Sequence, residues 1–85
     1  MVLTILSAIA LGRAIRDARR RAGLTQVQLA AITGLRQPAV SNLERGAGHA
    51  SFETVLRVLA VLRLEFVLRE IGDGSQGEID WESEA

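Results

Sequence analysis

The sequence lacks cysteine altogether and contains one histidine, one proline and no tyrosine. Without cysteine the chain forms neither a disulfide nor a thiolate metal site, which fits a protein of the reducing cytoplasm. His49 has no second histidine and no carboxylate cluster beside it in the sequence, so we expect it at the surface. The sequence also shows no nucleophile–base pair and no phosphate-binding loop. We therefore expect no enzymatic activity, no metal and no cofactor.

The sequence has no apolar run that could cross a membrane. The opening run, MVLTILSAIAL, stops at Gly12 and Arg13, which makes it too short for a bilayer, and no basic residue precedes it as in a signal peptide. We expect this run to belong to the folded domain and the protein to have no membrane partner. A chain of 85 residues supports one small domain with a marginal core. Stabilisation by a second subunit is therefore expected.

Positive and negative residues balance over the whole chain but are unevenly distributed along it. The formal net charge is zero. All ten basic residues are arginines between Arg13 and Arg69, and with five acidic residues up to Ile71 they give residues 1–71 a charge of +5. The last fourteen residues hold five acids and no base, a charge of −5. A basic body with an acidic tail is compatible with a nucleic-acid partner despite the neutral total.

The stretch from Thr25 to Gly46 predicts two short helices around a tight turn. Thr25 and Gln28 have the spacing of a capping box at the start of the first helix, and Gly34 ends it. The apolar stripe of this helix is Leu29, Ala30 and Ile32.

The second helix of this stretch has a polar outer face. Val40 and Leu43 are its inward positions, whereas Gln37, Ser41 and Arg45 share the opposite side because residues four apart stack on one face. Pro38 and Asn42 lie beside them. Such a face is typical of a helix that enters the DNA major groove.

Two further helices flank the central pair. Ser7 is a plausible N-cap for a helix that runs to Ala22 and stops at Gly23, with Leu11, Ile15, Ala18 and Ala22 towards the core. Its outer arginines, Arg13, Arg16 and Arg20, are either a solvated face or phosphate contacts. Ser51 starts the last helix, whose expected inward positions are Phe52, Val55, Leu56, Leu59 and Leu62.

The segment after the last helix has the period of a half-buried strand, because Leu64, Phe66 and Leu68 alternate with other residues. The only other candidate strand is Val2 to Leu6, which is almost equally well explained as a frayed terminus. A single strand cannot satisfy its own backbone groups. Antiparallel pairing with the same strand of a second subunit across a two-fold axis is the economical solution.

The central stretch resembles the helix-turn-helix of the Cro/C1-type (Xre) repressors. The resemblance rests on Leu24-Thr25-Gln26, Leu29-Ala30, Gly34-Leu35, Val40-Ser41 and Leu43-Glu44-Arg45-Gly46, and extends upstream to Leu11 and downstream to Leu56. It implies a mainly α, lambda-repressor-like domain of four helices and a partly buried ion pair between Arg19 and Glu44. The strand pattern at residues 64–68 departs from the fifth helix of many relatives and predicts a C-terminal β-strand that pairs across a homodimer.

The predicted DNA contacts are of two kinds. The second helix of the central stretch is the expected recognition helix, and the residues at its start face base edges. Gln37 suits adenine, and Arg36 suits guanine or reaches a phosphate instead. Pro38 packs on a thymine methyl group, and Ser41 is the fourth expected base contact. The expected phosphate contacts are Thr25, Gln26, Asn42 and Arg45. A two-fold dimer would place two such helices on an inverted-repeat site in double-stranded DNA.

The strand and tail resemble those of the HipB antitoxins, which implies a HipA-like serine/threonine kinase toxin as a partner. We divide the chain into a DNA-binding and dimerisation domain, residues 1–71, and an acidic tail, residues 72–85. Ile79 and Trp81 in this tail are either solvated or an apolar plug for a basic groove on the partner. A stand-alone Xre-family repressor and a protein-interaction module on the same scaffold remain alternatives.

Overall fold

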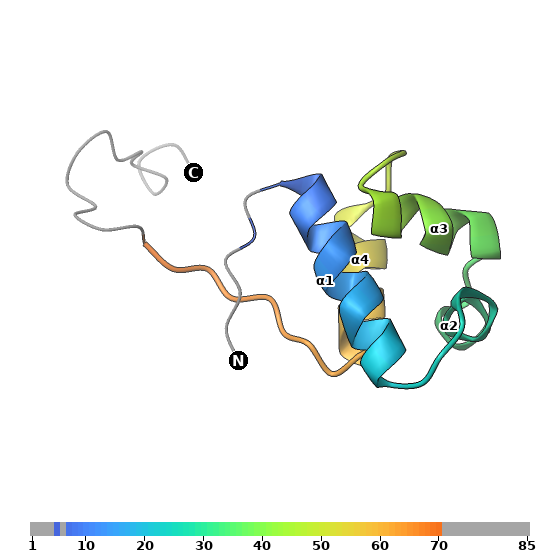
Figure 1. Ribbon diagram of the computed structural model, residues 1–85. Helices are drawn as coiled ribbons and strands as arrows, with labels where there is room; N and C mark the ends of the chain where they lie inside the picture. Colours follow the sequence, from blue (N-terminus) through green and yellow to red (C-terminus); the bar gives the residue numbers. More distant parts are fainter. Residues whose placement is uncertain (1–4, 6, 71–85) are drawn as a thin grey trace.

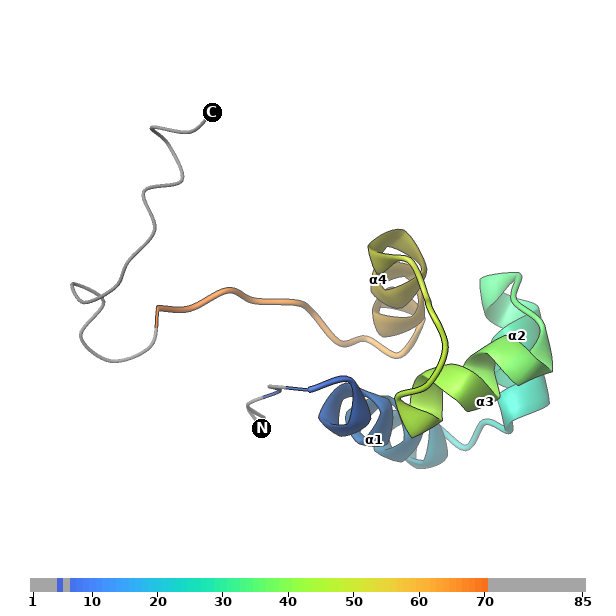
Figure 2. The ribbon, with the colours of Figure 1, turned by 90° about the horizontal axis from the view of Figure 1, so that it is seen from above.

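The computed structural model describes residue 5 and residues 7–70. Within these residues four helices follow one another: α1 (Ala8–Arg21), α2 (Gln26–Thr33), α3 (Gln37–Arg45) and α4 (Phe52–Val61). α3 packs against α1 and α2, and α2 also contacts α4, so that the short helices share one core (Figure 1; Figure 2). The predicted mainly α architecture is confirmed. Apart from Ile5, the candidate strand at Val2 to Leu6 lies outside the described residues.

The helix boundaries follow from local side-chain chemistry. The Ser7 hydroxyl accepts from the Ala10 amide at 3.0 Å and begins α1. Thr25 and Gln28 form the predicted capping box of α2, with bonds of 3.0 and 2.8 Å. Gly34 and Gly46 end α2 and α3 with φ values of 74° and 71°, which side chains with a Cβ adopt only at a cost. Ser51 caps α4 as expected.

The core consists of one apolar side chain from each helix together with their neighbours. Ile15, Leu29, Val40 and Val58 are fully buried. Around them pack other buried apolar residues: Ala18, Ala30, Leu43, Leu59 and Leu62. All four helices therefore depend on one shared cluster, and no helix can leave it without exposing apolar surface.

Several positions that we expected to face inward lie at the surface. On α4, Phe52 is 59% and Leu56 39% exposed, whereas Val58, which we did not predict, is fully buried. The buried face of α4 carries Val58 and Leu59, whereas Phe52 and Leu56, four residues apart, share a neighbouring face that lies outside the core. Ile32 on α2 and Ala22 after α1 are likewise exposed, because no other described element covers them.

Gly12 allows α1 and α3 to pack with their backbones in close contact. A Cβ at Gly12 would lie 2.4 Å from the carbonyl oxygen of Glu44 and 2.5 Å from that of Leu43. In a helix with free space, alanine would be more stable than glycine by about 1 kcal/mol. Here neither carbonyl belongs to a flexible side chain, so α1 and α3 would have to separate.

We therefore expect Gly12→Ala to destabilise the fold by about 1 to 3 kcal/mol, the usual cost of overpacking. Urea denaturation followed by circular dichroism measures this change. A more stable variant would show that the two helices separate at little cost.

After α4 the chain leaves the helical core as an extended segment, residues 65–70 (Figure 1; Figure 2). Arg63 turns the backbone with φ 59°, and Leu64 still packs against the core. The Phe66 ring then meets the Phe52 ring edge to face, with centroids 5.3 Å apart. No residue among 64–70 is assigned to a strand, so the strand through Leu64, Phe66 and Leu68 stays a prediction.

Candidate nucleic-acid interface

α2 and α3 form a compact helix-turn-helix. Gly34 ends α2, Leu35 packs against the core, and Arg36 begins α3 without a side-chain capping bond. The side of α3 towards the core carries Val40, Leu43 and Glu44. The rest of its surface is accessible: Gln37, Pro38 and Arg45 are exposed, and Ser41 and Asn42 are half-buried.

A buried ion pair connects α1 to α3. The Arg19 Nε donates to Glu44 Oε2 at 2.6 Å and its Nη2 donates to Glu44 Oε1 at 3.0 Å. The remaining Nη1 donates to the Leu24 carbonyl at 2.8 Å, so the same guanidinium also holds the turn before α2. Arg19 is 8% and Glu44 4% exposed. The expected pair of residues is in contact, in a bidentate arrangement that fixes the angle between the two helices.

The pKa of Glu44 reflects this environment. Burial acts to raise the pKa, but hydrogen bonds from Arg19 and Gln26 and the charges of Arg19 and Arg16 outweigh it, so the pKa of Glu44 lies below its ordinary value. In turn, the hydrogen bond to Glu44 raises the pKa of Arg19 against the effect of burial. Glu44 is therefore an ionised acceptor at neutral pH.

Gln26 connects this ion pair to the first residue of α3. Its Nε2 donates to Glu44 Oε1 at 3.1 Å, and its Oε1 accepts from Gln37 Nε2 at 2.7 Å. The structure thus joins a residue that we expected at phosphates to one that we expected at bases. The bond between Gln26 and Gln37 spans eleven residues of sequence, and no local pattern could have revealed it.

The other predicted contact residues lie around the same face. Arg45 donates to Asn42 Oδ1 at the end of α3, so these two side chains act as a pair. The Thr25 hydroxyl accepts the Gln28 amide within the capping box, which leaves its own O–H free to donate. Arg36 and Pro38 are exposed in the first turn of α3.

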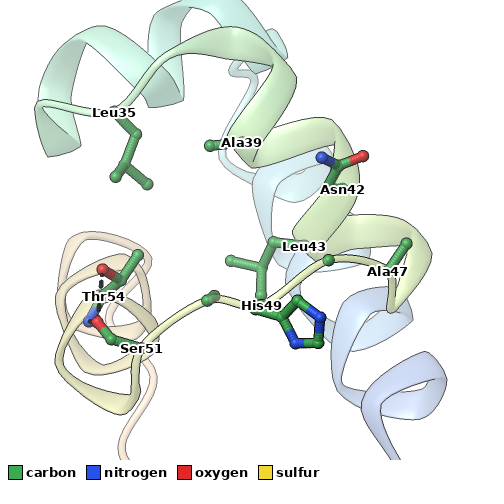
Figure 3. Close-up of a pocket in the computed structure, with 10 residues that line it drawn as sticks. Leu35, Ala39, Asn42, Leu43, Ala47, His49, Ser51 and Thr54 are labelled. Atoms are coloured by element: carbon green, nitrogen blue, oxygen red, sulfur yellow. Dashed lines mark hydrogen bonds between the residues drawn. The ribbon is translucent and has the colours of Figure 1, made fainter.

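A shallow groove flanks α3 on the side of the loop that leads to α4 (Figure 3). It encloses about 400 Å³ and is lined by residues of α3, the loop and the first turn of α4. Asn42 and His49 are among its polar lining residues, and the Ser51 hydroxyl donates a hydrogen bond to Thr54 Oγ1 at 2.9 Å (Figure 3). The lining residues other than Asn42, His49, Ser51 and Thr54 are small or aliphatic. No sequence pattern indicated this groove, because only the fold brings Leu35 and Ala39 next to the loop.

Residue 5 and residues 7–70 contain no group of three or more histidine, cysteine or acidic residues able to hold a metal ion. Nor do they include a helix with the length and apolar character that a membrane crossing needs. On the accessible side of α3 the polar groups are amides, a hydroxyl and a guanidinium group, which suit phosphates and base edges.

The fold and this polar face define a helix-turn-helix DNA-binding domain. The model of one family, described as Helix-turn-helix (HTH_3), matches residues 15–68, and the chain belongs to this family. The resemblance to the Xre-type repressors is confirmed. Family members are DNA-binding regulators, so the expectation that the protein is not an enzyme holds as well.

Known proteins with similar sequences or structures come from the same class. An uncharacterized HTH-type transcriptional regulator of Haemophilus influenzae is 33% identical over 54 residues, which cover 64% of this chain and 55% of the relative. The chain thus spans about half the length of that protein. A chain of the HipB-O4 20mer complex is 28% identical with a TM-score of 0.74, over 84% of this chain and 100% of the other. A chain of the HipA-HipB-O2-O3 complex has the same identity and coverage and a TM-score of 0.75.

Proposed function

We propose that the protein is a cytoplasmic transcriptional repressor that binds an inverted-repeat DNA site as a homodimer. The observation that carries this proposal is the division of α3 into a buried side, with Val40 and Leu43, and an accessible side made of amides, a hydroxyl and an arginine. A polar side of this kind would be unfavourable on a helix buried in a core, whereas the DNA major groove presents complementary donors and acceptors. Two subunits would place their α3 helices about 34 Å apart, one turn of DNA.

Residues at the start of α3 would contact bases, and residues at the start of α2 and the end of α3 would contact phosphates. Gln37 would pair with adenine, Arg36 with guanine or a phosphate, Pro38 with a thymine methyl group and Ser41 with either kind of base edge. Thr25 and Gln26 at the start of α2, and the coupled Asn42 and Arg45 at the end of α3, would hold phosphates on either side.

Dimerisation would use an apolar surface formed by Phe52, Leu56, Phe66 and Leu68, here named the α4–arm surface. Phe66 is 49% and Leu68 86% exposed although both are large and apolar. The contact between Phe52 and Phe66 joins the extended segment to α4. A second copy of the chain would cover this surface and provide a partner strand for residues 64–68, since exposed apolar patches mark interfaces.

We further propose that the protein is the antitoxin of a HipBA-type operon and holds a HipA-like kinase toxin. Similarity to a complete chain of the HipA-HipB-O2-O3 complex supports this. Ile79 and Trp81, proposed to contact the toxin, lie outside the described residues. Co-purification with the product of the neighbouring reading frame tests the proposal. A stand-alone repressor would bind its promoter but retain no such product, and an interaction module would bind no DNA.

One pair of variants tests the DNA-binding proposal. Gln37→Ala should cost about 1 to 3 kcal/mol of binding free energy and relax preference at one base pair. Arg45→Ala should instead weaken binding to all sequences alike and reduce the salt dependence, because it removes a phosphate contact. Gel-shift titrations on the protein's own promoter, repeated at several salt concentrations, separate the two effects. If Arg45→Ala keeps the wild-type salt slope, its phosphate role is wrong.

A further inference from the structure

The outer side of α1 carries a row of arginines, here named the α1 arginine stripe: Arg13, Arg16 and Arg20. All three are exposed. Because they are three or four residues apart, they follow one another on one face over about 10 Å of the helix axis. The two ion pairs among the described residues use other arginines. Asp17 is the only acidic residue of α1, so this surface has a surplus of positive charge.

The α1 arginine stripe lies close to α3. The two helices pack directly on each other. Arg16 is also near enough to Glu44 of α3 for its charge to help lower the pKa of that carboxyl. An acidic segment bound on the stripe would therefore lie beside the face of α3 that we propose enters DNA. Its carboxylates would repel DNA phosphates within about 10 Å, the screening length at about 0.1 M salt.

We propose that the α1 arginine stripe binds the acidic segment of the same chain, Glu78-Ile79-Asp80-Trp81-Glu82, and that this contact masks positive charge next to the DNA-binding face. The proposal goes beyond the proposed function, because the contact itself requires neither DNA nor a toxin. Duplex DNA, or a partner that takes the acidic tail, would compete with the contact and release the stripe.

The chain is long enough for this contact. Leu64 packs against the core, and the extended segment, residues 65–70, leads away from it. Six extended residues can carry the chain at most about 20 Å from the core. Asp80 follows Glu70 by ten residues, which span up to about 34 Å when extended. The tail can therefore return from the end of the extended segment to the surface of its own helical core.

The spacing of the charges also fits. Glu78, Asp80 and Glu82 are two residues apart, which places neighbouring carboxylates about 7 Å from each other in an extended chain. Successive arginines of the stripe are about 4.5 and 6 Å apart along the helix axis, and their long side chains cover the difference. A guanidinium group pairs with a carboxylate and also stacks on an indole ring. Three such pairs in register form a network, whereas one exposed pair would contribute little.

Trp81 provides a direct test, because it is the only tryptophan of the chain and its fluorescence reports on the tail alone. In the full-length protein a bound tail should shield the indole from acrylamide. Raising the salt from about 0.05 to about 0.5 M should screen the contact and increase the quenching constant about twofold. Replacement of all three stripe arginines by glutamine, which has a similar helix propensity, should give the same increase at low salt.

The matched control replaces Arg21, Arg63 and Arg69 by glutamine. These arginines are also exposed but lie outside the stripe, so the net charge changes by the same amount. The control should keep the quenching constant of the wild type. If both sets of substitutions increase it alike, the overall charge rather than the stripe attracts the tail, and the proposal is overturned.

Neutralising the tail tests the other side of the contact. The full-length variant Glu78→Gln/Asp80→Asn/Glu82→Gln should show the same increase in quenching as the stripe variant. Combining the two sets of substitutions should add nothing further, because both remove one and the same contact. An additive effect would mean that the stripe and the tail act independently, which contradicts the proposal.

Binding to a random-sequence duplex separates this proposal from the proposed function. At low salt the neutral-tail variant should bind about three to ten times more tightly than wild type, because the stripe is then free for phosphates. Equal affinities would overturn the masking effect. If Trp81 is quenched equally in wild type and in the stripe variant, the tail does not occupy the stripe, and the inference fails while DNA binding stands. If Trp81 responds as expected but no variant binds DNA, the proposed function fails and the contact remains.

Discussion

Replacement of Arg19 by methionine is expected to lower the free energy of unfolding by about 3 to 5 kcal/mol, the usual cost of stranding one member of a buried ion pair. Glu44 would keep only the hydrogen bond from Gln26 while remaining 4% exposed in the native packing. Loss of the bond to the Leu24 carbonyl would also loosen the turn before α2. Urea denaturation at neutral pH, followed by circular dichroism, measures the effect. For a domain of this size the loss is a large part of the total stability.

Two companion variants distinguish a stranded charge from a loss of packing. Arg20→Met removes an exposed arginine of the same helix and should change stability by no more than about 0.5 kcal/mol. The double variant Arg19→Met/Glu44→Leu removes both charges and should recover most of the loss, because apolar replacement of a whole buried pair is often neutral or stabilising. A double variant as unstable as Arg19→Met would contradict the electrostatic explanation.

Acidification provides a check on the same variants. The folded-state pKa of Glu44 is lower than its ordinary value, so ionised Glu44 stabilises the folded state above the pKa of an unfolded glutamate. This contribution is lost as the pH falls through the folded-state pKa. The difference in stability between wild type and Arg19→Met should therefore narrow in acid. A difference independent of pH would mean that the ionisation of Glu44 is not responsible.

The parts of the fold that depend on neighbours in sequence were predictable. Capping by Ser7, the Thr25–Gln28 box and the turn at Gly34 each require chemistry within three or four residues. The polar face of α3 also follows from helical periodicity, since Val40 and Leu43 mark the opposite side.

Features that depend on contacts between distant segments were not predictable in this way. From the sequence alone, Gly12 is only a residue of low helix propensity. The structure shows why a glycine is required there, since a Cβ at this position would lie 2.4 Å from the α3 backbone. Gln26 could be assigned to phosphates from its place at the start of α2, but not to Glu44, eighteen residues away. Apolar periodicity identified Phe52 and Leu56 as residues of an apolar helix face. It could not tell a face that packs in the core from one that packs on another subunit, because both kinds of face contain the same residue types.

Disruption of the α4–arm surface is expected to give the largest effect on DNA binding. We predict that Phe66→Asp yields a monomer that binds the full inverted repeat about 10² to 10⁴ times more weakly than wild type, since a dimer converts the second half-site contact into an intramolecular one. Affinity for an isolated half-site should be nearly unchanged. Sedimentation equilibrium gives the oligomeric state, and gel shifts on full and half sites give the two affinities.

Val67→Asp is the matched control, because Val67 is 68% exposed and alternates with Phe66 along the extended segment. It adds the same charge at nearly the same distance from the DNA, so a general electrostatic penalty would affect both variants alike. If only Phe66→Asp dissociates the dimer, the side of the segment that meets Phe52 is the one a second subunit covers. If both variants dissociate, charge rather than the α4–arm surface is responsible. If Phe66→Asp stays dimeric and binds the inverted repeat normally, another surface must join the subunits, and the exposed apolar side chains on α4 require a different partner.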